Sequence, residues 1–254
     1  MLNVDYKIAC KAMADRTQGV IRSVIGEQQT GFIRGRRIQG NVMENIITCR
    51  NNTGDGAVVL LDFVKAYNRV NRGWLEEVLV GMNFGPEFRR RVRETMREAR
   101  SVVEQERVSE SFFIERGVRQ GCPFTPVLFA CIVEPMAEAI IRSKKIRGMT
   151  TLGVDHRISQ FADDTCGYPR NEVDFIKWMN KVHKFEGHSG MKINLRKSAI
   201  IHLGKKWSLG KYEGMELKER DRLLGVDVSS SCASFTQPAL TRYFETAKEW
   251  EGKK

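Results

Sequence analysis

Two adjacent aspartates, Asp163 and Asp164, limit the local folds open to this chain more sharply than any other residues. Neighbouring side chains of a regular strand point to opposite faces, so both carboxylates can serve one site only from a tight turn, where aspartate is well tolerated. Apolar residues precede the pair and Gly167 follows it. Residues 158–168 therefore predict two strands that meet in a hairpin at the aspartates.

A third carboxylate, Asp62, ends the apolar and β-branched run at residues 57–61, which predicts a buried central strand. Carboxylates held close together repel one another, which raises their pKa values and costs stability unless a cation lies between them. Three converging aspartates can hold two cations such as Mg²⁺ ~3.5–4 Å apart for in-line displacement at phosphorus. The pattern alone leaves open a solvated turn at the pair and a helix cap at Asp62.

The remaining periodicities predict helices separated by short strands. Helices are expected at residues 6–25, 41–50, 74–82, 86–100, 125–142 and 172–186, a hairpin within 102–116 and a strand at 198–203. This order is typical of the α+β class, with helices on one face of a small antiparallel sheet.

The charge balance indicates the kind of partner. Lys and Arg (42) outnumber Asp and Glu (31), a formal net charge of +11, so a polyanion is favoured, nucleic acid before an acidic membrane surface. No apolar run approaches the roughly 18–20 residues that span a bilayer, so we expect no membrane association. The six cysteines are widely spaced, without a C-x-x-C pair, which favours reduced thiols.

Seven segments occur in an informative order along the chain. They are LNVDYKI at 2–8, QTGFIRGR at 29–36, LDFVKAYNRV at 61–70, VRQGCPFTP at 118–126, FADD at 161–164, GMKINLRKS at 190–198 and LLGV at 223–226. Together they resemble the fingers, catalytic, substrate-positioning and primer-grip motifs of the reverse transcriptase domain of non-long-terminal-repeat (LINE-type) retrotransposons. The resemblance extends from residue 2 to about residue 231.

This resemblance implies a two-metal catalytic centre. Asp62, Asp163 and Asp164 would bind two Mg²⁺ ions, with Mn²⁺ as a substitute, and the backbone carbonyl of Phe63 would be a further ligand. Asn68 stands where the family usually has a second aspartate, and we expect altered hydrogen bonding there rather than loss of activity.

The resemblance also implies sites for nucleotide and nucleic acid. Tyr67 matches the aromatic gate beneath the sugar, Gln120 would contact the nucleotide or template base, and Lys197 would lie near the triphosphate. The nucleotide-binding residues so implied are Lys65, Ala66, Tyr67, Gln120, Gly121 and Lys197, and the template- or primer-binding residues are Arg34, Arg36, Arg37, Leu224 and Gly225. Core packing for Tyr67, a solvated Lys197 and a plain surface loop at 31–37 are the alternatives.

The implied fold is a right-hand polymerase palm, an antiparallel sheet backed by helices, with partial fingers and a largely absent thumb. The expected divisions are partial fingers at 1–56, palm at 57–84, a fingers or palm insertion at 85–125, palm to the primer-grip hairpin at 126–231, and the start of a thumb or a tail at 232–254.

The implied function is an RNA-directed DNA polymerase that joins deoxynucleotides to a primer 3′-hydroxyl on an RNA template. Its partners would be the RNA template, a DNA primer and dNTPs, and its location the nucleus, with a cytoplasmic ribonucleoprotein stage. The alternatives are a truncated nucleic-acid-binding remnant without polymerase activity, or a related palm polymerase such as a group II intron maturase or an RNA-dependent RNA polymerase. The intact Asp62, Asp163 and Asp164 favour an enzyme, whereas the short tail favours the remnant.

Overall fold

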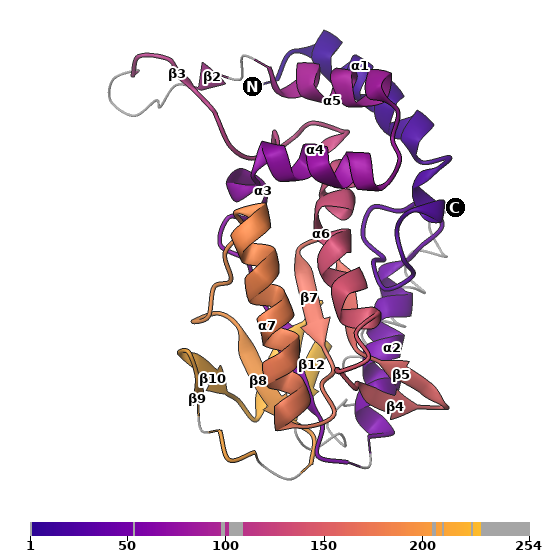
Figure 1. Cartoon of the computed structure of the whole chain (residues 1–254), viewed down its shortest axis with the longest axis vertical. Coiled ribbons are helices and arrows are strands. Elements are labelled where there is room, and N and C mark those ends of the chain that lie inside the picture. The colour runs from indigo at the N-terminus through magenta and orange to yellow at the C-terminus, as the bar shows by residue number, and fades with distance from the viewer. Residues whose placement is uncertain are drawn as a thin grey trace, which may run out of the picture.

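The computed structural model describes residues 2–52, 54–97, 100–101, 109–204, 207–209, 211–224 and 226–229. Its centre is a six-stranded sheet in the order β6 (Ile158–Phe161), β7 (Asp164–Gly167), β1 (Ala57–Leu61), β8 (Ala199–His202), β10 (Met215–Leu217) and β9 (Lys211–Tyr212), counted within these residues (Figure 1). All neighbours are antiparallel except β8 and β10. The expected antiparallel sheet is confirmed, with one parallel pairing at this edge because the second strand of the β9–β10 hairpin, rather than the first, pairs with β8.

Strand β1 lies between β7 and β8 and is buried along its whole length, as its sequence predicts. Its side chains alternate between two apolar clusters. Ala57, Val59 and Leu61 join one cluster, whereas Val58 and Leu60 join the other. A strand covered on both faces has to be apolar throughout, which explains the unbroken run.

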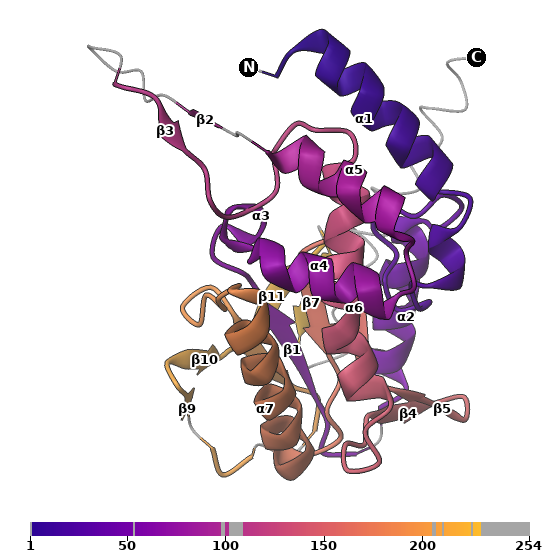
Figure 2. The ribbon, with the colours of Figure 1, turned by 45° about the horizontal axis from the view of Figure 1, so that its top comes forward.

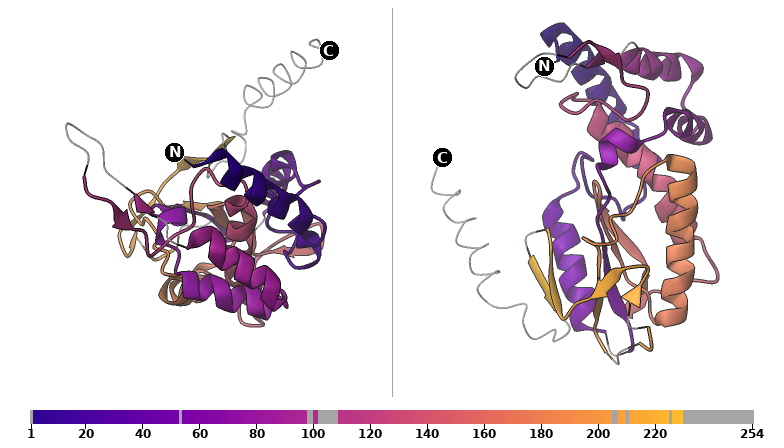
Figure 3. Two further views of the ribbon diagram at one scale, coloured as in Figure 1. Left: turned by 90° about the horizontal axis from the view of Figure 1, so that it is seen from above. Right: turned by 90° about the vertical axis from the view of Figure 1, so that its left-hand side faces the viewer.

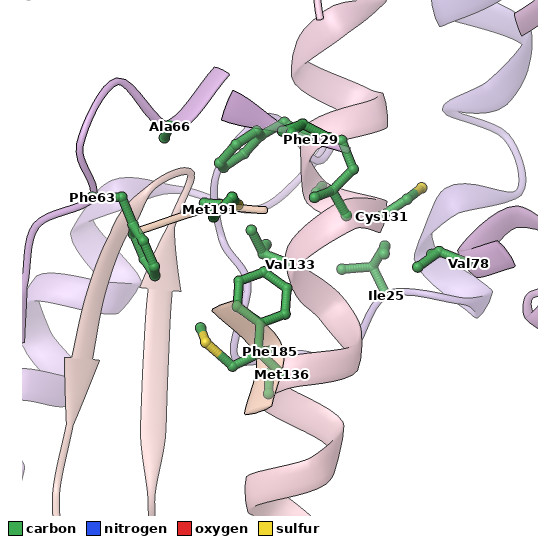
Figure 4. Close-up of a cluster of buried hydrophobic side chains, with 14 of the residues drawn as sticks. Ile25, Phe63, Ala66, Val78, Phe129, Cys131, Val133, Met136, Phe185 and Met191 are labelled. Carbon is green, nitrogen blue, oxygen red and sulfur yellow. The ribbon is translucent and has the colours of Figure 1, made fainter. Parts of the chain in front are cut away.

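Helices cover both faces of this sheet, rather than the single face expected. Helices α6 (Thr125–Ile141) and α7 (Glu172–Ser189) lie on one face, and α2 (Ile38–Arg50) with the hairpin of β11 (Arg220–Leu223) and β12 (Val226–Ser229) lies on the other (Figure 3). The larger cluster surrounds α6, whose Phe129 and Val133 lie among side chains such as Phe63, Phe185 and Ile25 (Figure 4). The sheet is thereby packed on both faces.

The first helix is shorter than its sequence predicts. Helix α1 (Val4–Thr17) ends in a turn, and a short 3₁₀ helix follows at Ile21–Ser23, so the continuous helix expected at 6–25 is wrong. The side chain of Gln18 donates to the carbonyl of Phe32 and accepts from the amide of Arg34, at 2.7 and 2.9 Å. These contacts with a distant loop replace continuation of the helix.

Two further helices pack across the end of α6. They are α4 (Arg72–Gly81) and α5 (Pro86–Met96), with the short α3 (Ala66–Arg69) before them. Helix α5 ends before the expected residue 100 because Arg97 is already extended. Strands β2 (Arg100–Ser101) and β3 (Phe112–Phe113) pair in an arm that projects from the body (Figure 2), and the part of the expected hairpin at 102–108 lies outside the described residues.

One hairpin has no counterpart in the sequence predictions. Strands β4 (Met149–Thr151) and β5 (Val154–His156) are joined by Leu152 and Gly153, both with positive φ. Such a pair of left-handed residues matches the twist of a two-residue hairpin. In the part of the chain that the structure describes, no helix is both long and apolar enough to cross a membrane.

Candidate active site

The hairpin of β6 and β7 brings the two adjacent aspartates to its tip. Phe161 pairs with Asp164, so Ala162 and Asp163 form a two-residue turn. Ala162 has a φ of +58°, in the left-handed region that non-glycine residues adopt only with strain. The predicted hairpin is confirmed, and the turn frees the aspartates from the alternation of a regular strand.

Asp62 lies beside this turn. Leu61, the last residue of β1, pairs with Thr165 of β7, so the next residue of each strand, Asp62 and Asp164, continues the same register. Residues opposite one another in antiparallel strands have Cα atoms about 4.5–5.5 Å apart. Segments a hundred residues apart in the chain therefore bring three carboxylates to one end of the palm sheet.

The pKa values of the aspartates at this end of the sheet reflect how close together they lie. Burial raises the pKa of Asp163, and the negative charge of Asp62 raises it further. Burial also raises the pKa of Asp164, with added repulsion from Asp163 and Asp62. Among the described residues, no three His, Cys, Asp or Glu side chains are gathered at metal-ligand spacing. The raised pKa values of Asp163 and Asp164 nevertheless show that the carboxylates lie close enough to repel one another.

The main chain of Asp62 is held by the turn that precedes β8. Its amide donates to the hydroxyl of Ser198 at 3.1 Å, and its carbonyl accepts from the amide of Asn194 at 2.8 Å. The Ser198 hydroxyl in turn donates to the carbonyl of Asn194 at 2.9 Å. Lys197 is exposed in this turn, so the structure brings it to the same end of the sheet as the aspartates.

Tyr67 lies between the core and the carboxylates. Its ring stacks on Phe129 of α6, with centroids 4.3 Å apart. Burial raises the pKa of its phenol to about 12, and the nearby charges of Asp163 and Asp164 add to the shift. The ring is therefore packed against α6, and its phenol lies close enough to Asp163 and Asp164 to be affected by their charges.

The segment between Asp62 and Tyr67 turns sharply. Phe63 is buried and forms a bridge with Ile193, and Lys65 has a φ of +46° at the start of α3. Lys65 is exposed, whereas Ala66 is buried. The amides that follow Asp62 thus lie at the beginning of a short helix directly after the carboxylate.

The loop that carries Gln120 is attached to α3. Its Gly117 amide donates to the carbonyl of Val70, and the next amide donates to the carbonyl of Tyr67, each at 2.8 Å. A Cβ at Gly117 would lie 2.7 Å from backbone atoms of α3, so this crossing requires glycine. Gln120 and Gly121 are exposed in the turn before α6, and Gly121 has a φ of +78°.

The three arginines of the basic loop differ in their surroundings. Arg34 is exposed and forms a 3.5 Å ion pair with Asp15. Arg36 donates to the carbonyls of Ile25, Gly26 and Gln29 at 2.8, 2.5 and 2.7 Å, which gives it a part in building the loop. Arg37 is exposed at the start of α2.

The expected primer-grip segment forms the turn between β11 and β12. Leu224 has a φ of +50° in this turn, and Gly225 lies outside the described residues. Leu223 and Leu224 contact the cluster on the α2 face of the sheet. The hairpin is therefore anchored to the palm through its apolar side chains.

Sequence reasoning overlooked Gln29 and Ser198, although both lie in the motifs quoted above. Gln29 is fully buried against the turn of Ala162, and Ser198 is fully buried against Asp62. Neither residue stands out by charge or periodicity. The available signal was a polar residue next to a glycine or a strand, too common a pattern to indicate a role.

The helix-covered sheet with these strand connections has the fold of a polymerase palm. The fold is similar to that of apo telomerase from Candida tropicalis truncated from its C-terminal domain, with a TM-score of 0.61 at 14% identity over 86% of this chain and 44% of that one. It is also similar to telomerase from Candida albicans in complex with a TWJ fragment of telomeric RNA, with a TM-score of 0.54 at 11% identity over 91% and 37% of the two chains. At these identities, the fold is what the proteins share.

Sequence comparison gives the family. The chain belongs to the reverse transcriptase (RNA-dependent DNA polymerase) family, whose model matches residues 1–232. It is 30% identical over 205 residues to an uncharacterized 149 kDa protein of transposon TX1 from Xenopus laevis, covering 78% of this chain and 16% of that protein. The resemblance inferred from the motifs is confirmed, and the chain spans about a sixth of its curated relative.

Proposed function

We propose that this chain is the RNA-directed DNA polymerase core of a non-long-terminal-repeat retrotransposon, which extends a DNA primer with deoxynucleotides on an RNA template. The observation that carries the proposal is the convergence of Asp62, Asp163 and Asp164 at one end of the sheet in a member of the reverse transcriptase family. A nuclear location, with a cytoplasmic ribonucleoprotein stage, is part of this proposal and rests on the resemblance to retrotransposon proteins.

The donors at this sheet end fit a hard divalent cation. All three are carboxylates, and two of them have raised pKa values partly because of their neighbours' charge. Asp62, Asp163 and Asp164, with the carbonyl of Phe63, would hold two Mg²⁺ ions, or Mn²⁺ in their place. When bound, such ions neutralise the phosphates and lower the pKa of the primer hydroxyl.

The chain's own residues position the reactants. The primer 3′-oxygen attacks the α-phosphorus, the bond to the β-phosphate breaks, and pyrophosphate leaves. Tyr67, held by its stack on Phe129, would exclude a 2′-hydroxyl from the sugar of the incoming nucleotide. The exposed Lys197 would give a proton to the pyrophosphate, and the exposed Gln120 and Gly121 would contact the incoming nucleotide or the template base.

The test is extension of a labelled DNA primer on an RNA template with dNTPs and Mg²⁺. We expect extension by the wild-type chain and none by Asp163→Asn. Glu94→Gln, which removes an exposed carboxylate paired with Arg97 on α5, serves as the control and should extend normally.

The same assay separates the other candidate functions. Tight RNA binding with no extension by the wild-type chain would indicate the nucleic-acid-binding remnant. Preferred incorporation of ribonucleotides would indicate an RNA-dependent RNA polymerase. Either result overturns the proposal.

A further inference from the structure

A short segment of the N-terminal region runs beside β6, next to the catalytic turn. Gln29 and Gln160 form a parallel bridge. The amide of Gln160 donates to the carbonyl of Gln28 at 2.7 Å, and the amide of Thr30 donates to the carbonyl of Gln160 at 2.9 Å. Residues 28–30 thus extend the sheet by a short pairing beyond β6.

The side chain of Gln29 reaches past this pairing to the turn itself. Its Oε1 accepts from the amide of Ala162 at 2.9 Å, and its Nε2 donates to the carbonyl of Ala162 at 3.2 Å. The same Oε1 accepts from the amide of Gly31 at 2.8 Å. Because the carboxamide bonds both main-chain groups of one residue, it acts toward Ala162 as a neighbouring strand would.

The position of these bonds matters because the turn is strained and tightly enclosed. Ala162 has a φ of +58°, a conformation that persists only when surrounding contacts fix it. A Cβ at Gly31 would lie 2.3 Å from the amide nitrogen of Ala162, so the loop approaches the turn as closely as glycine permits. Gln29 itself is 0% exposed, so water does not compete for these groups.

We propose that Gln29 is a positioning residue for nucleotide transfer, which holds the backbone of Ala162 so that Asp163 and Asp164 stay fixed beside Asp62. The inference rests on the proposed function, because positioning matters only if the carboxylates are catalytic. The same loop continues into Phe32, whose ring lies 6.3 Å from that of Phe161, and into the exposed Arg34. Gln29 therefore couples the basic loop to the catalytic turn.

The test compares two neighbouring glutamines. Methionine has a similar length and flexibility but cannot make these hydrogen bonds. Gln29→Met should lower kcat by about tenfold or more, with KM for dNTP and Kd for template–primer within about twofold of wild type. Gln28→Met is the matched control, since its side chain donates to Glu134 at 3.1 Å and not to the turn. It should lower Tm and leave kcat within about twofold.

A second variant and a second measurement test the inference even if Gln29→Met folds poorly or the wild-type chain is inactive. Gln29→Glu keeps the acceptors for both amides but loses the donor to the Ala162 carbonyl, so its kcat should lie between wild type and Gln29→Met. Hydrogen exchange should show the amides of Ala162 and Gly31 opening at least about tenfold faster in Gln29→Met, which lacks their acceptor, with amides of β8 unchanged. If the wild-type chain fails to extend primers, the proposed function fails, and the exchange data still decide whether Gln29 holds the turn.

Three results would overturn the inference. The first is a Gln29→Met or Gln29→Glu chain that folds and keeps wild-type kcat. The second is unchanged exchange at the Ala162 amide in Gln29→Met. The third is an equal loss of kcat in Gln28→Met, which would show that any disturbance of the segment has the same effect.

Discussion

Asp163 and Asp164 are held where their charges are unfavourable, as the proposed catalytic role would require. Burial and the neighbouring carboxylates raise the pKa values of both residues. Active sites commonly sacrifice stability in this way, because the groups that chemistry requires are not those that the fold would prefer. The cost should therefore be visible in the pH dependence of stability.

As pH rises, the carboxyl groups of these aspartates ionise in the unfolded chain near the ordinary aspartate pKa of 3.8. In the folded chain they ionise only at a higher pH. Stability is therefore lost between these two values and stays lower at neutral pH. We predict that Asp163→Asn, without divalent ions, melts about 2–4 °C higher than wild type at pH 7. The difference should vanish below about pH 3. Calorimetry across this range checks it, and an asparagine variant that is less stable at pH 7 would contradict the assignment.

Tyr67 should set the choice of sugar. Tyr67→Ala removes the ring that stacks on Phe129 near the carboxylates. We therefore predict that discrimination against ribonucleotides falls by about 10–100-fold. Tyr67→Phe keeps the ring and should keep the discrimination. The measurement is the ratio of kcat/KM for dNTP and rNTP, and equal ratios in wild type and Tyr67→Ala would assign the ring to packing alone.

At the scale of elements, the end of β1 is fixed by the turn before β8. Ser198→Ala would leave the amide of Asp62 without its partner, which costs about 1–3 kcal/mol. We predict this loss of stability together with a fall in kcat of about tenfold. Ser189→Ala is the matched control, because Ser189 is equally buried but accepts from Met191. It should lose stability and keep kcat, and identical behaviour of the two variants would count against the role of Ser198.

Patterns along the chain predicted the elements whose structure is decided locally. The apolar run of β1, the hairpin around Asp163 and the long apolar helix α6 all follow from periodicity and turn chemistry. The helix expected at 6–25 failed because Gln18 bonds a loop beyond it. Gln29 could not be predicted as a contact of Ala162, because its partner lies 133 residues away and no periodicity records such a pairing.

For the whole molecule, the basic residues behind the net charge of +11 differ in how closely carboxylates pair with them. On α5, Arg90 and Arg91 pair with Glu87, and Arg93 pairs with Glu76, so much of this basic helix is matched locally. In the loop at 31–37, Arg34 has one longer ion pair, 3.5 Å from Asp15, and Arg37 is exposed, so we expect this loop to contribute more to polyanion binding than the helix does.

Two arginines of the basic loop should affect different properties, one nucleic-acid binding and the other stability. Arg34→Gln removes an exposed charge and should reduce the slope of log K against log salt for template–primer binding by about one, without changing Tm. Arg36→Gln removes donors to three carbonyls and should lower Tm instead. Filter binding from low to high salt, together with thermal melts, checks both, and a reversed pattern would exclude this division of roles.

The most direct test concerns the three carboxylates together. Single-turnover extension of a DNA primer on RNA should be measured for Asp62→Asn, Asp163→Asn and Asp164→Asn, with template–primer affinity recorded for each. We predict that every variant binds template–primer within about twofold of wild type and that each loses about a thousandfold or more in rate. Any one of them that binds normally and polymerises within about tenfold of wild type would contradict a shared catalytic centre.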